Sequence, residues 1–187
     1  MDNPRVFDFK PFIIGGSISL RPLYSEDFEA LYAAAADPLI WEQHPHPLRY
    51  QREVFKSGFF ASAIASPGAL VVVENLSGRI IGSSRFYDWN AEQKEVAIGF
   101  TFLARSHWGG QTNREMKQLM LAHAFRWANT VWFHVGINNI RSRKAMEKIG
   151  GEFSHEAPLA INGVTDIYAF YRIKAPDHLL NESVAQL

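Results

Sequence analysis

The chain has 187 residues, of which 47% are apolar and 13% aromatic, and its 19 Lys and Arg balance 19 Asp and Glu. This richness in aromatic side chains excludes an intrinsically disordered chain, and the zero net charge argues against a general nucleic-acid binder. Because cysteine is absent, a Cys nucleophile, a zinc–thiolate site and a disulfide framework are excluded as well.

The length suits a single domain. We expect residues 1–187 to form one domain, with a core over about 18–173 and a polar tail from about Pro176. The longest apolar run, Ala30–Ala36, is far shorter than the ~20 residues of a membrane span, and the N-terminus lacks a signal-peptide core. These features predict a cytoplasmic protein that binds neither nucleic acid nor membranes.

The N-terminal half mixes predicted strands and helices. A strand over Ile18–Leu20 ends at Arg21–Pro22, and Ser25 is a candidate cap for a helix from Glu26 to about Ala36. A second helix is predicted over Gln51–Ala65 and ends at Ser66–Pro67–Gly68. Three strands joined by turns of hairpin length are then expected at Ala69–Asn75, Arg79–Asp88 and Glu95–Leu103.

The C-terminal half continues with helix, strand and helix. Apolar residues at helical spacing predict a helix over Thr112–Ala128, followed by a short buried strand at Val131–Val135. A further helix is expected over Ile140–Ile149, ended by Gly150–Gly151, and at least one more strand over Val164–Ile173. Hairpin strands followed by helix, strand and helix predict an α+β fold rather than a doubly wound parallel one.

The first segment that indicates chemistry is the junction between the third hairpin strand and the following helix. Trp108–Gly109–Gly110 precedes the helix, and Thr112 with Glu115 matches a capping box. A helix N-terminus preceded by glycines exposes backbone N–H groups and a partial positive charge, which suits a phosphate. Arg105 and Arg114 flank this turn. The alternative is an ordinary strand–turn–helix connection.

The second segment is the junction between Val131–Val135 and the next helix. Asn138 and Asn139 are both candidate caps, and Ser142 lies one turn inside the helix. The Ser142 hydroxyl could therefore point toward the same crevice as the capping side chain. The alternative is plain helix capping with a solvated basic face.

Taken together, the two segments resemble the acetyl-CoA-binding core of the GNAT N-acetyltransferase superfamily. The likeness is nearest to its ribosomal-protein-alanine acetyltransferase-like branch, where W-G-x-G is followed by N-x-x-S and E-K-x-G. The corresponding residues here are Trp108–Gln111, Asn139–Ser142 and Glu147–Gly150. Leu20–Arg21–Pro22 and Ile98–Gly99–Phe100 also match this branch, so the resemblance covers roughly residues 18–173.

The resemblance implies a mixed, mostly antiparallel sheet with splayed central strands flanked by helices, and acetyl-CoA as co-substrate without a metal. Backbone groups near Phe102 and Leu103 would pair with the pantetheine amides, Asn139 would hydrogen-bond the pantetheine side of the cofactor, and Ser142 would help protonate the leaving thiolate. The pyrophosphate would contact the turn and its neighbours: Arg105, Trp108, Gly109, Gly110, Gln111, Thr112, Asn113 and Arg114. The zero net charge then averages over a local basic set: Arg105, Arg114, Lys117, Arg143 and Lys148.

This chain departs from the family pattern in two places. Gln111 replaces a motif glycine and Asn113 a small residue, and a left-handed backbone at Gln111 would cost ~1–2 kcal/mol. Ala97 stands where many relatives carry a catalytic Glu, so Glu95, two residues earlier on the same strand face, is the candidate base. The alternative for Glu95 is a solvent-facing carboxylate.

The missing carboxylate bears on the choice of amine. Deprotonating a lysine amine at pH 7 costs roughly 4.6 kcal/mol, whereas an α-amino group costs only about 1–1.4 kcal/mol. A site without the usual base therefore favours an α-amine or another weakly basic acceptor.

The stretch Trp41–Leu48 lies between the first helices, a region that borders the acceptor site in the family. Trp41, Glu42 and His44 are therefore candidate acceptor-binding residues. His44 and His46 form an H-x-H pair, but no third metal ligand is suggested nearby. His107, His123 and His134 are interpreted as packing or surface residues.

The sequence therefore predicts an acetyl-CoA-dependent N-acetyltransferase that transfers acetyl directly to a primary amine of a protein N-terminus or a small molecule. The alternative is a non-catalytic acyl-CoA-binding module, suggested by Gln111, Asn113 and Ala97. The acceptor is not identified, and a homodimer is compatible with the sequence.

Overall fold

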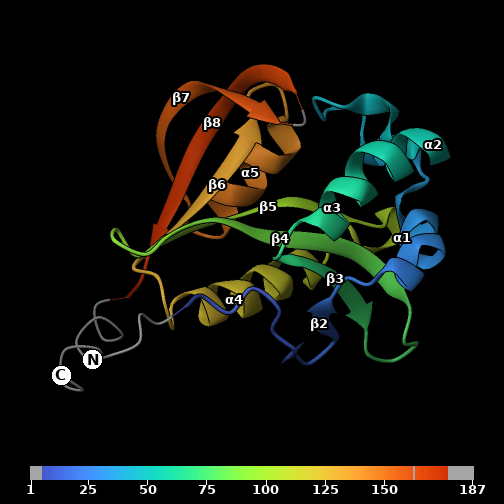
Figure 1. The fold of residues 1–187 in the computed structure, drawn as a ribbon, viewed down its shortest axis with the longest axis horizontal. Helices are drawn as coiled ribbons and strands as arrows, with labels where there is room; N and C mark the ends of the chain where they lie inside the picture. Colours follow the sequence, from blue (N-terminus) through green and yellow to red (C-terminus); the bar gives the residue numbers. More distant parts are fainter. Residues whose placement is uncertain (1–5, 162, 177–187) are drawn as a thin grey trace.

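The computed structural model describes residues 6–161 and 163–176, which form one eight-stranded sheet covered by helices on both faces (Figure 1). The predicted tail from Pro176 lies almost wholly outside these residues. The strands are β1 (Ile13–Ile14), β2 (Ile18–Pro22), β3 (Ala69–Glu74), β4 (Ile80–Asn90), β5 (Glu95–Leu103), β6 (Thr130–Gly136), β7 (Glu152–Ile161) and β8 (Val164–Lys174). The α-helices are α1 (Phe28–Ala35), α2 (Arg52–Val54), α3 (Ala61–Ala65), α4 (Thr112–Ala124) and α5 (Ile140–Lys148).

The strand order is β1-β2-β3-β4-β5-β6-β8-β7, and the single parallel pair is β5 with β6. Figure 1 shows β6, β7 and β8 rising away from β3, β4 and β5, so the sheet opens between β5 and β6. The predicted mixed, mostly antiparallel α+β sheet is therefore confirmed, including the three consecutive hairpin strands β3, β4 and β5. The strand β7, which pairs with β8 along its length, was not predicted.

Two separate apolar cores cover the two faces of the sheet. One lies beneath α4 and α5 and contains Met116, Met120 and Met146 together with Ile98, Leu103 and Phe133 from the strands. The other lies beneath α1 and the segment 55–65, where Trp41, Phe55, Phe59 and Phe102 pack together. The large buried aromatic side chains of these cores pack against both faces of the sheet and stabilise the strands on either side of the gap between β5 and β6.

The helix boundaries differ from the predictions where tertiary contacts compete with local signals. The capping box is wrong: Gln111 is the N-cap of α4 and has no side-chain cap bond. Glu115 instead accepts hydrogen bonds from the backbone N–H of Ser17, at 2.9 Å, and from its hydroxyl. The carboxylate thus joins α4 to the start of β2 rather than capping its own helix.

The Ser25 cap is also wrong, because a 3-10 turn over Ser25–Asp27 precedes α1. Asp27 is the N-cap of α1 but makes no side-chain cap bond to that helix. Its carboxylate accepts from the backbone N–H of Tyr24, before the turn, at 2.9 Å and pairs with Arg21 at 2.7 Å. The predicted helix over Gln51–Ala65 is confirmed, but its middle, Phe55–Phe60, is a π-helix. Helix α4 ends at Ala124, four residues before the predicted Ala128.

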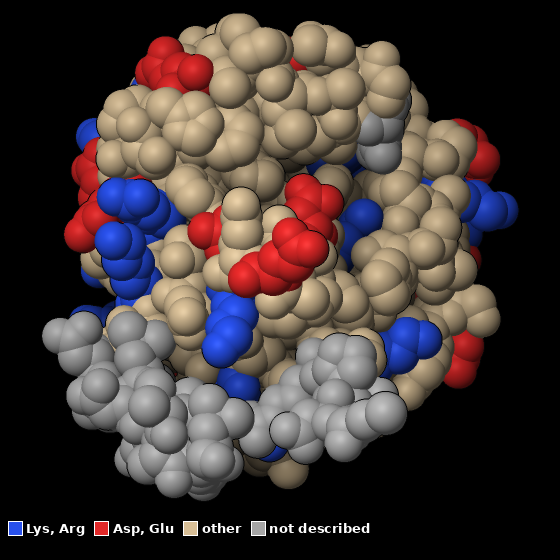
Figure 2. Space-filling view, turned by 60° about the vertical axis from the view of Figure 1, so that its left-hand side comes forward, with Lys and Arg blue, Asp and Glu red and all other residues tan. Residues whose placement is uncertain are grey.

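None of the helices among residues 6–161 and 163–176 is long and apolar enough to cross a bilayer. Figure 2 shows basic and acidic side chains interspersed on the face toward the viewer, without a broad surface of one sign among the coloured residues.

Candidate active site

The central feature of the site is the separation of β5 from β6. These strands pair only over Glu95–Ala97 and Thr130–Trp132. Beyond Ala97, residues 98–103 of β5 have no partner on the β6 side. Phe100 has a φ of 51°, a left-handed conformation unusual for a non-glycine residue, which bends β5 in this unpaired part. The backbone groups of residues 98–103 that face β6 therefore have no strand partner and can bond a ligand.

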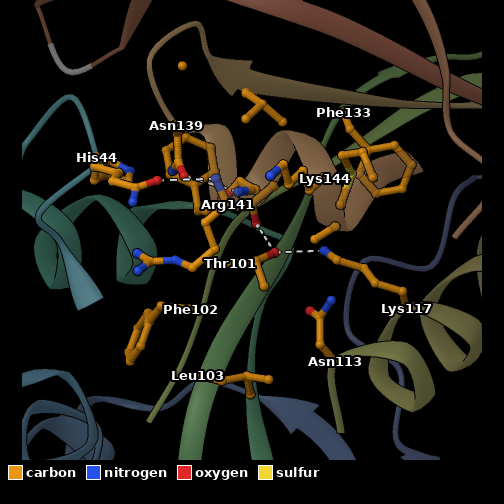
Figure 3. Close-up of a pocket in the computed structure, with 18 of the residues that line it drawn as sticks. His44, Thr101, Phe102, Leu103, Asn113, Lys117, Phe133, Asn139, Arg141 and Lys144 are labelled. Atoms are coloured by element: carbon orange, nitrogen blue, oxygen red, sulfur yellow. Dashed lines mark hydrogen bonds between the residues drawn. The ribbon is translucent and has the colours of Figure 1, made fainter. Parts of the chain in front are cut away.

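A cavity of about 920 Å³ lies between the two diverging strands (Figure 3). Its walls come from the diverging parts of β5 and β6, the N-terminal ends of α4 and α5, and the loop that follows α1. Most of the residues predicted to bind the cofactor line it: Phe102, Leu103, Trp108, Gly109, Gly110, Gln111, Asn113, Arg114, Asn139 and Ser142. Arg105 and Thr112 do not, and Arg105 instead pairs with Asp37 at 2.6 Å.

The turn before α4 keeps the helix N-terminus open. The indole N–H of Trp108 donates to the carbonyl of Leu103 at 3.0 Å, which fixes the turn to the end of β5. Gly109 supplies the left-handed position, with a φ of 73°. Gln111 has an ordinary φ of −82° and is exposed. The strain considered for Gln111 is therefore absent, and the uncapped N–H groups of the first turn retain their attraction for an anion.

At the start of α5 the structure decides between the two candidate caps, Asn138 and Asn139. Asn139 caps this helix, because its Oδ1 accepts from the backbone N–H of Ser142 at 3.1 Å. Both residues line the cavity, and Asn139 is buried. The Asn139 carboxamide N–H₂ makes no hydrogen bond within the described chain, so it is free to donate to a ligand.

Arg141 joins α5 to the loop that follows α1. Its guanidinium lies 4.1 Å from the centre of the Trp108 ring and donates to the carbonyl of Ile40 at 2.9 Å. Glu42 lies 3.5 Å from the same guanidinium. These contacts hold the loop over the opening between β5 and β6.

Two of the three predicted acceptor-binding residues line the cavity, and the third does not. Trp41 and His44 line the cavity, and the indole N–H of Trp41 donates to the carbonyl of Ala35 at 2.8 Å. Glu42 does not line it and is instead occupied by Arg141. Among residues 6–161 and 163–176, no three His, Asp or Glu side chains gather in a metal-binding group.

The cavity is electrostatically one-sided. No Asp or Glu in the described part of the chain lines it, and Glu95 lies at the paired end of β5, outside the lining. The lining instead contains six cationic side chains: Arg49, Arg114, Lys117, Arg141, Lys144 and Lys148. Arg143, which the sequence placed in the basic set, donates to the Tyr171 hydroxyl at 3.0 Å instead.

Lys117 is a cavity residue whose environment the sequence did not reveal. Its Nζ donates to the Thr101 hydroxyl at 2.8 Å and lies 5.4 Å from the Phe133 ring (Figure 3). Its side chain is 2% exposed, and burial lowers its pKa to about 7. The spacing does carry a signal, because Lys117 falls three residues before Met120, on the apolar face of α4.

Tyr87 and His134 form a second polar pair on the cavity wall, whereas the sequence suggested no role for Tyr87 and interpreted His134 as a packing or surface residue. The Tyr87 hydroxyl lies 2.9 Å from Nδ1 of His134. Burial raises the pKa of Tyr87 and, with the nearby His155, lowers that of His134 to about 4. Both groups are therefore neutral at pH 7, and no local sequence pattern links residues 47 positions apart.

Comparisons with known proteins identify the family and the fold of the chain. A family model described as "Acetyltransferase (GNAT) domain" matches residues 17–152, whereas no curated protein sequence matches the chain significantly. A GCN5-related N-acetyltransferase from Brucella melitensis superposes with a TM-score of 0.77 at 18% identity, covering 91% of this chain and 81% of its own.

Two further solved structures share the fold. A GNAT-family acetyltransferase from Bacillus anthracis has a TM-score of 0.71 at 17% identity, covering 88% of this chain and 98% of its own. The microcin C7 self-immunity acetyltransferase MccE, in complex with acetyl-CoA and AMP, has a TM-score of 0.70 at 14% identity, covering 90% and 99%.

Proposed function

Because the chain belongs to the GNAT acetyltransferase family, we propose that it transfers the acetyl group of acetyl-CoA directly to a primary amine. The observation that carries this proposal is the opening between β5 and β6, which leaves a cavity of about 920 Å³ next to an uncapped helix N-terminus. Nothing in the ordinary φ of Gln111 obstructs this use of the turn, so one motive for a non-catalytic alternative is removed.

The proposed cofactor contacts follow from the lining of the cavity. The pyrophosphate suits the α4 N-terminus with Gly110, Asn113 and Arg114, where backbone donors and a cation converge. The pantetheine amides suit the unpaired edge of β5 near Phe102 and the free carboxamide of Asn139. A lining rich in cations and free of described carboxylates fits a polyanionic substrate.

In the proposed reaction the amine attacks the thioester carbonyl, an N–C bond forms and the C–S bond breaks. The nitrogen loses one proton and the leaving thiolate gains one, so a hydroxyl that donates to the thiolate is reprotonated by the proton that the nitrogen loses. Ser142 is the proposed donor, since it lines the cavity next to Asn139. Holding both reactants in one cavity would supply much of the rate.

The lining also bears on the base and the acceptor. Because no described carboxylate lines the cavity, Glu95 is poorly placed to remove a proton from the amine. An acceptor that is largely neutral at working pH needs less help, so we propose an α-amine or another weakly basic amine. A peptide N-terminus, as in the ribosomal-protein-alanine acetyltransferase-like branch, and a small-molecule amine both meet this condition.

Calorimetric titration and turnover test the proposal separately. We expect acetyl-CoA and CoA to bind in calorimetry, and CoA to be released when the enzyme receives a mixed panel of peptide and small-molecule amines. Absence of heat with either cofactor form would contradict the whole proposal. A clear preference for ε-amines over N-terminal amines in a peptide panel would contradict the choice of acceptor only.

Ser142→Ala tests the proposed proton donor. We expect kcat to fall by at least tenfold while the free energy of unfolding changes little, because the Asn139 cap uses the backbone N–H of residue 142. Unchanged turnover would contradict the proposed role of Ser142 as proton donor.

A further inference from the structure

Arg49 is a buried cation without a carboxylate partner among the described residues. Its side chain is 3% exposed, lines the cavity and lies over the rings of Trp41 and Phe59, at 5.6 and 5.3 Å from their centres. Its one hydrogen-bond contact within the described chain is Nη1 to Nε2 of His44, at 3.3 Å. A guanidinium has five N–H donors, and burying them without acceptors costs free energy.

The contact with His44 is itself unsatisfied. The backbone N–H of His46 donates to Nδ1 of His44 at 2.9 Å, and Arg49 points a donor at Nε2. Burial, Arg49 and His46 lower the His44 pKa well below its usual value, so the ring is neutral. A neutral imidazole has one lone pair, yet two donors face its two nitrogens. Whichever ring nitrogen carries the proton, one of the two donors therefore meets an N–H instead of a lone pair.

The loop that carries His44 is closely packed. A Cβ at Gly136 of β6 would lie 2.7 Å from Cγ of Pro45, and the His44 ring lies 5.5 Å from the Trp41 ring and 5.6 Å from the His46 ring, centre to centre. An oxyanion placed beside the two donors would accept from both and remove the mismatch.

Further groups favour an anion at the same place. Tyr168 lines the cavity, interacts electrostatically with Arg49, and its hydroxyl makes no hydrogen bond within the described chain. Arg85 adds a second buried positive charge near Arg49, although it lies outside the cavity lining and its two Nη atoms donate to the carbonyl and hydroxyl of Ser62 at 3.3 and 3.5 Å. No described carboxylate lines the cavity to compensate these charges.

The phosphates of CoA do not account for this anion site. Figure 3 shows His44 on the opposite side of the cavity from Asn113, which marks the α4 N-terminus where the pyrophosphate is proposed to bind. The Arg49 side of the cavity is the side of Trp41 and the loop after α1, where the acceptor is expected.

We propose that Arg49, His44 and Tyr168 bind an oxyanion group, a carboxylate or a phosphate, carried by the acceptor amine. This inference rests on the proposed function and adds to it the chemical class of the acceptor: a primary amine with an acidic group close to the nitrogen. The guanidinium and the imidazole N–H would hold that group and so orient the amine toward the thioester.

Matched pairs of acetylated products test the anion site without a titrating amine. The CoA-saturated protein, isotope-labelled for NMR, is titrated with N-acetylglycine and its amide, and with N-acetylethanolamine phosphate and N-acetylethanolamine. We expect at least one anionic compound to bind about tenfold more tightly than its neutral partner, and the pair that responds identifies carboxylate or phosphate. Equal binding within both pairs, or binding of none of the four compounds, would overturn the proposal.

Arg49→Met should abolish the preference while leaving the affinity for the neutral compounds within twofold. The matched control is Arg52→Met, three residues later, because Arg52 pairs with Glu29 on the exposed surface and does not line the cavity. Should Arg49→Met fail to fold, Tyr168→Phe removes only a hydroxyl and should weaken the anion about threefold. An unchanged preference in the variants that fold would overturn the assignment of these residues.

Failure of this inference and failure of the proposed function are distinguishable. If the protein releases CoA with amines but shows no anion preference, the inference alone fails. If the protein binds no acetyl-CoA yet retains the anion preference when titrated without CoA, the proposed function fails and the acceptor assignment fails with it, while the anion site itself stands.

Discussion

Lys117, Arg49 and His44 illustrate how single residues acquire unusual chemistry through burial. Each lines the cavity, each is desolvated, and in each the pKa is lowered because the charged form loses water. None has a carboxylate partner in the described chain that would stabilise its charged form. Burying such groups lowers the stability of the free protein, and this cost is typical of a site where a charged ligand supplies the missing partner.

Lys117→Met tests this cost through pH. The pKa of Lys117 is about 7 in the folded protein and near 10.5 in the unfolded chain, so between these values the unfolded state binds more protons. The free-energy cost of burying the charged Lys117 ammonium is therefore full below pH 7 and decreases as the pH rises above 7. We expect Lys117→Met to be more stable than the wild type at pH 6.5, with the advantage falling by roughly 1.4 kcal/mol per pH unit above pH 7.

Denaturant unfolding of both proteins between pH 6 and pH 9 measures this difference. A stability difference that stays constant over this range would contradict the depressed pKa of Lys117.

Glu95→Gln tests the carboxylate that the sequence favoured as base. Because Glu95 lies at the paired end of β5, outside the cavity, we expect kcat/KM to change less than threefold. The pH–rate profile should keep its shape. A loss of a hundredfold or more would show that Glu95 acts on the amine after all, for instance through a water molecule.

At the scale of elements, the junctions of β5 with α4 and of β6 with α5 build the two ends of the cavity. At the first junction Gly109 provides the left-handed turn and Gln111 continues with helical backbone. At the second, Asn139 caps α5. The bond from Glu115 to Ser17 and the contacts of Arg141 with Ile40 then fix these helices to distant parts of the chain.

A pair of alanine substitutions separates the roles of the two turn residues. Gly109→Ala places a side chain at a φ of 73°, which we expect to cost ~1–2 kcal/mol of stability and to weaken CoA binding. Gln111→Ala keeps an ordinary φ on an exposed residue, so the CoA dissociation constant should stay within twofold. Calorimetry with CoA measures the affinity of both variants, and thermal unfolding measures their stability. A larger loss of affinity or stability in Gln111→Ala than in Gly109→Ala would contradict the geometry of the turn.

At the scale of the whole molecule, a chain of zero net charge concentrates positive charge in one cavity. Its 19 Lys and Arg balance 19 Asp and Glu, yet six cations and no described carboxylate line the opening between β5 and β6. Acidic side chains are instead spread over the exterior, as on the face in Figure 2. A cavity of one sign focuses the attraction for an anionic ligand, although the molecule as a whole is neutral.

Salt dependence measures this local charge. Raising ionic strength from 0.1 to 1 M shortens the screening length from about 10 to about 3 Å, so we expect the acetyl-CoA dissociation constant to rise by about five- to tenfold. Arg114→Gln should reduce that dependence, whereas Arg126→Gln, an exposed cation near the other end of α4, should not. Affinity independent of salt in the wild type would contradict a charged binding site.

The sequence by itself determined the parts of this protein that local physics controls. The strands, the helix over Gln51–Ala65, the glycine turn before α4 and an asparagine cap on α5 follow from periodicity and short-range backbone chemistry. The family and its mixed sheet were expected from the resemblance of the two motif segments to a known family. The predicted capping box of Thr112 and Glu115 was wrong, because the Glu115 carboxylate accepts hydrogen bonds from Ser17, which is distant in the sequence.

Only the tertiary structure decided which charges lie in the cavity and which lie outside it. Arg105 and Arg143 find partners elsewhere, Glu95 falls at the closed end of β5, and Arg49 and Lys117 become buried cavity cations. Burial and pairing depend on residues far apart in the chain, so no local pattern encodes them. The acceptor side of the site, with its two facing donors, belongs to this second class.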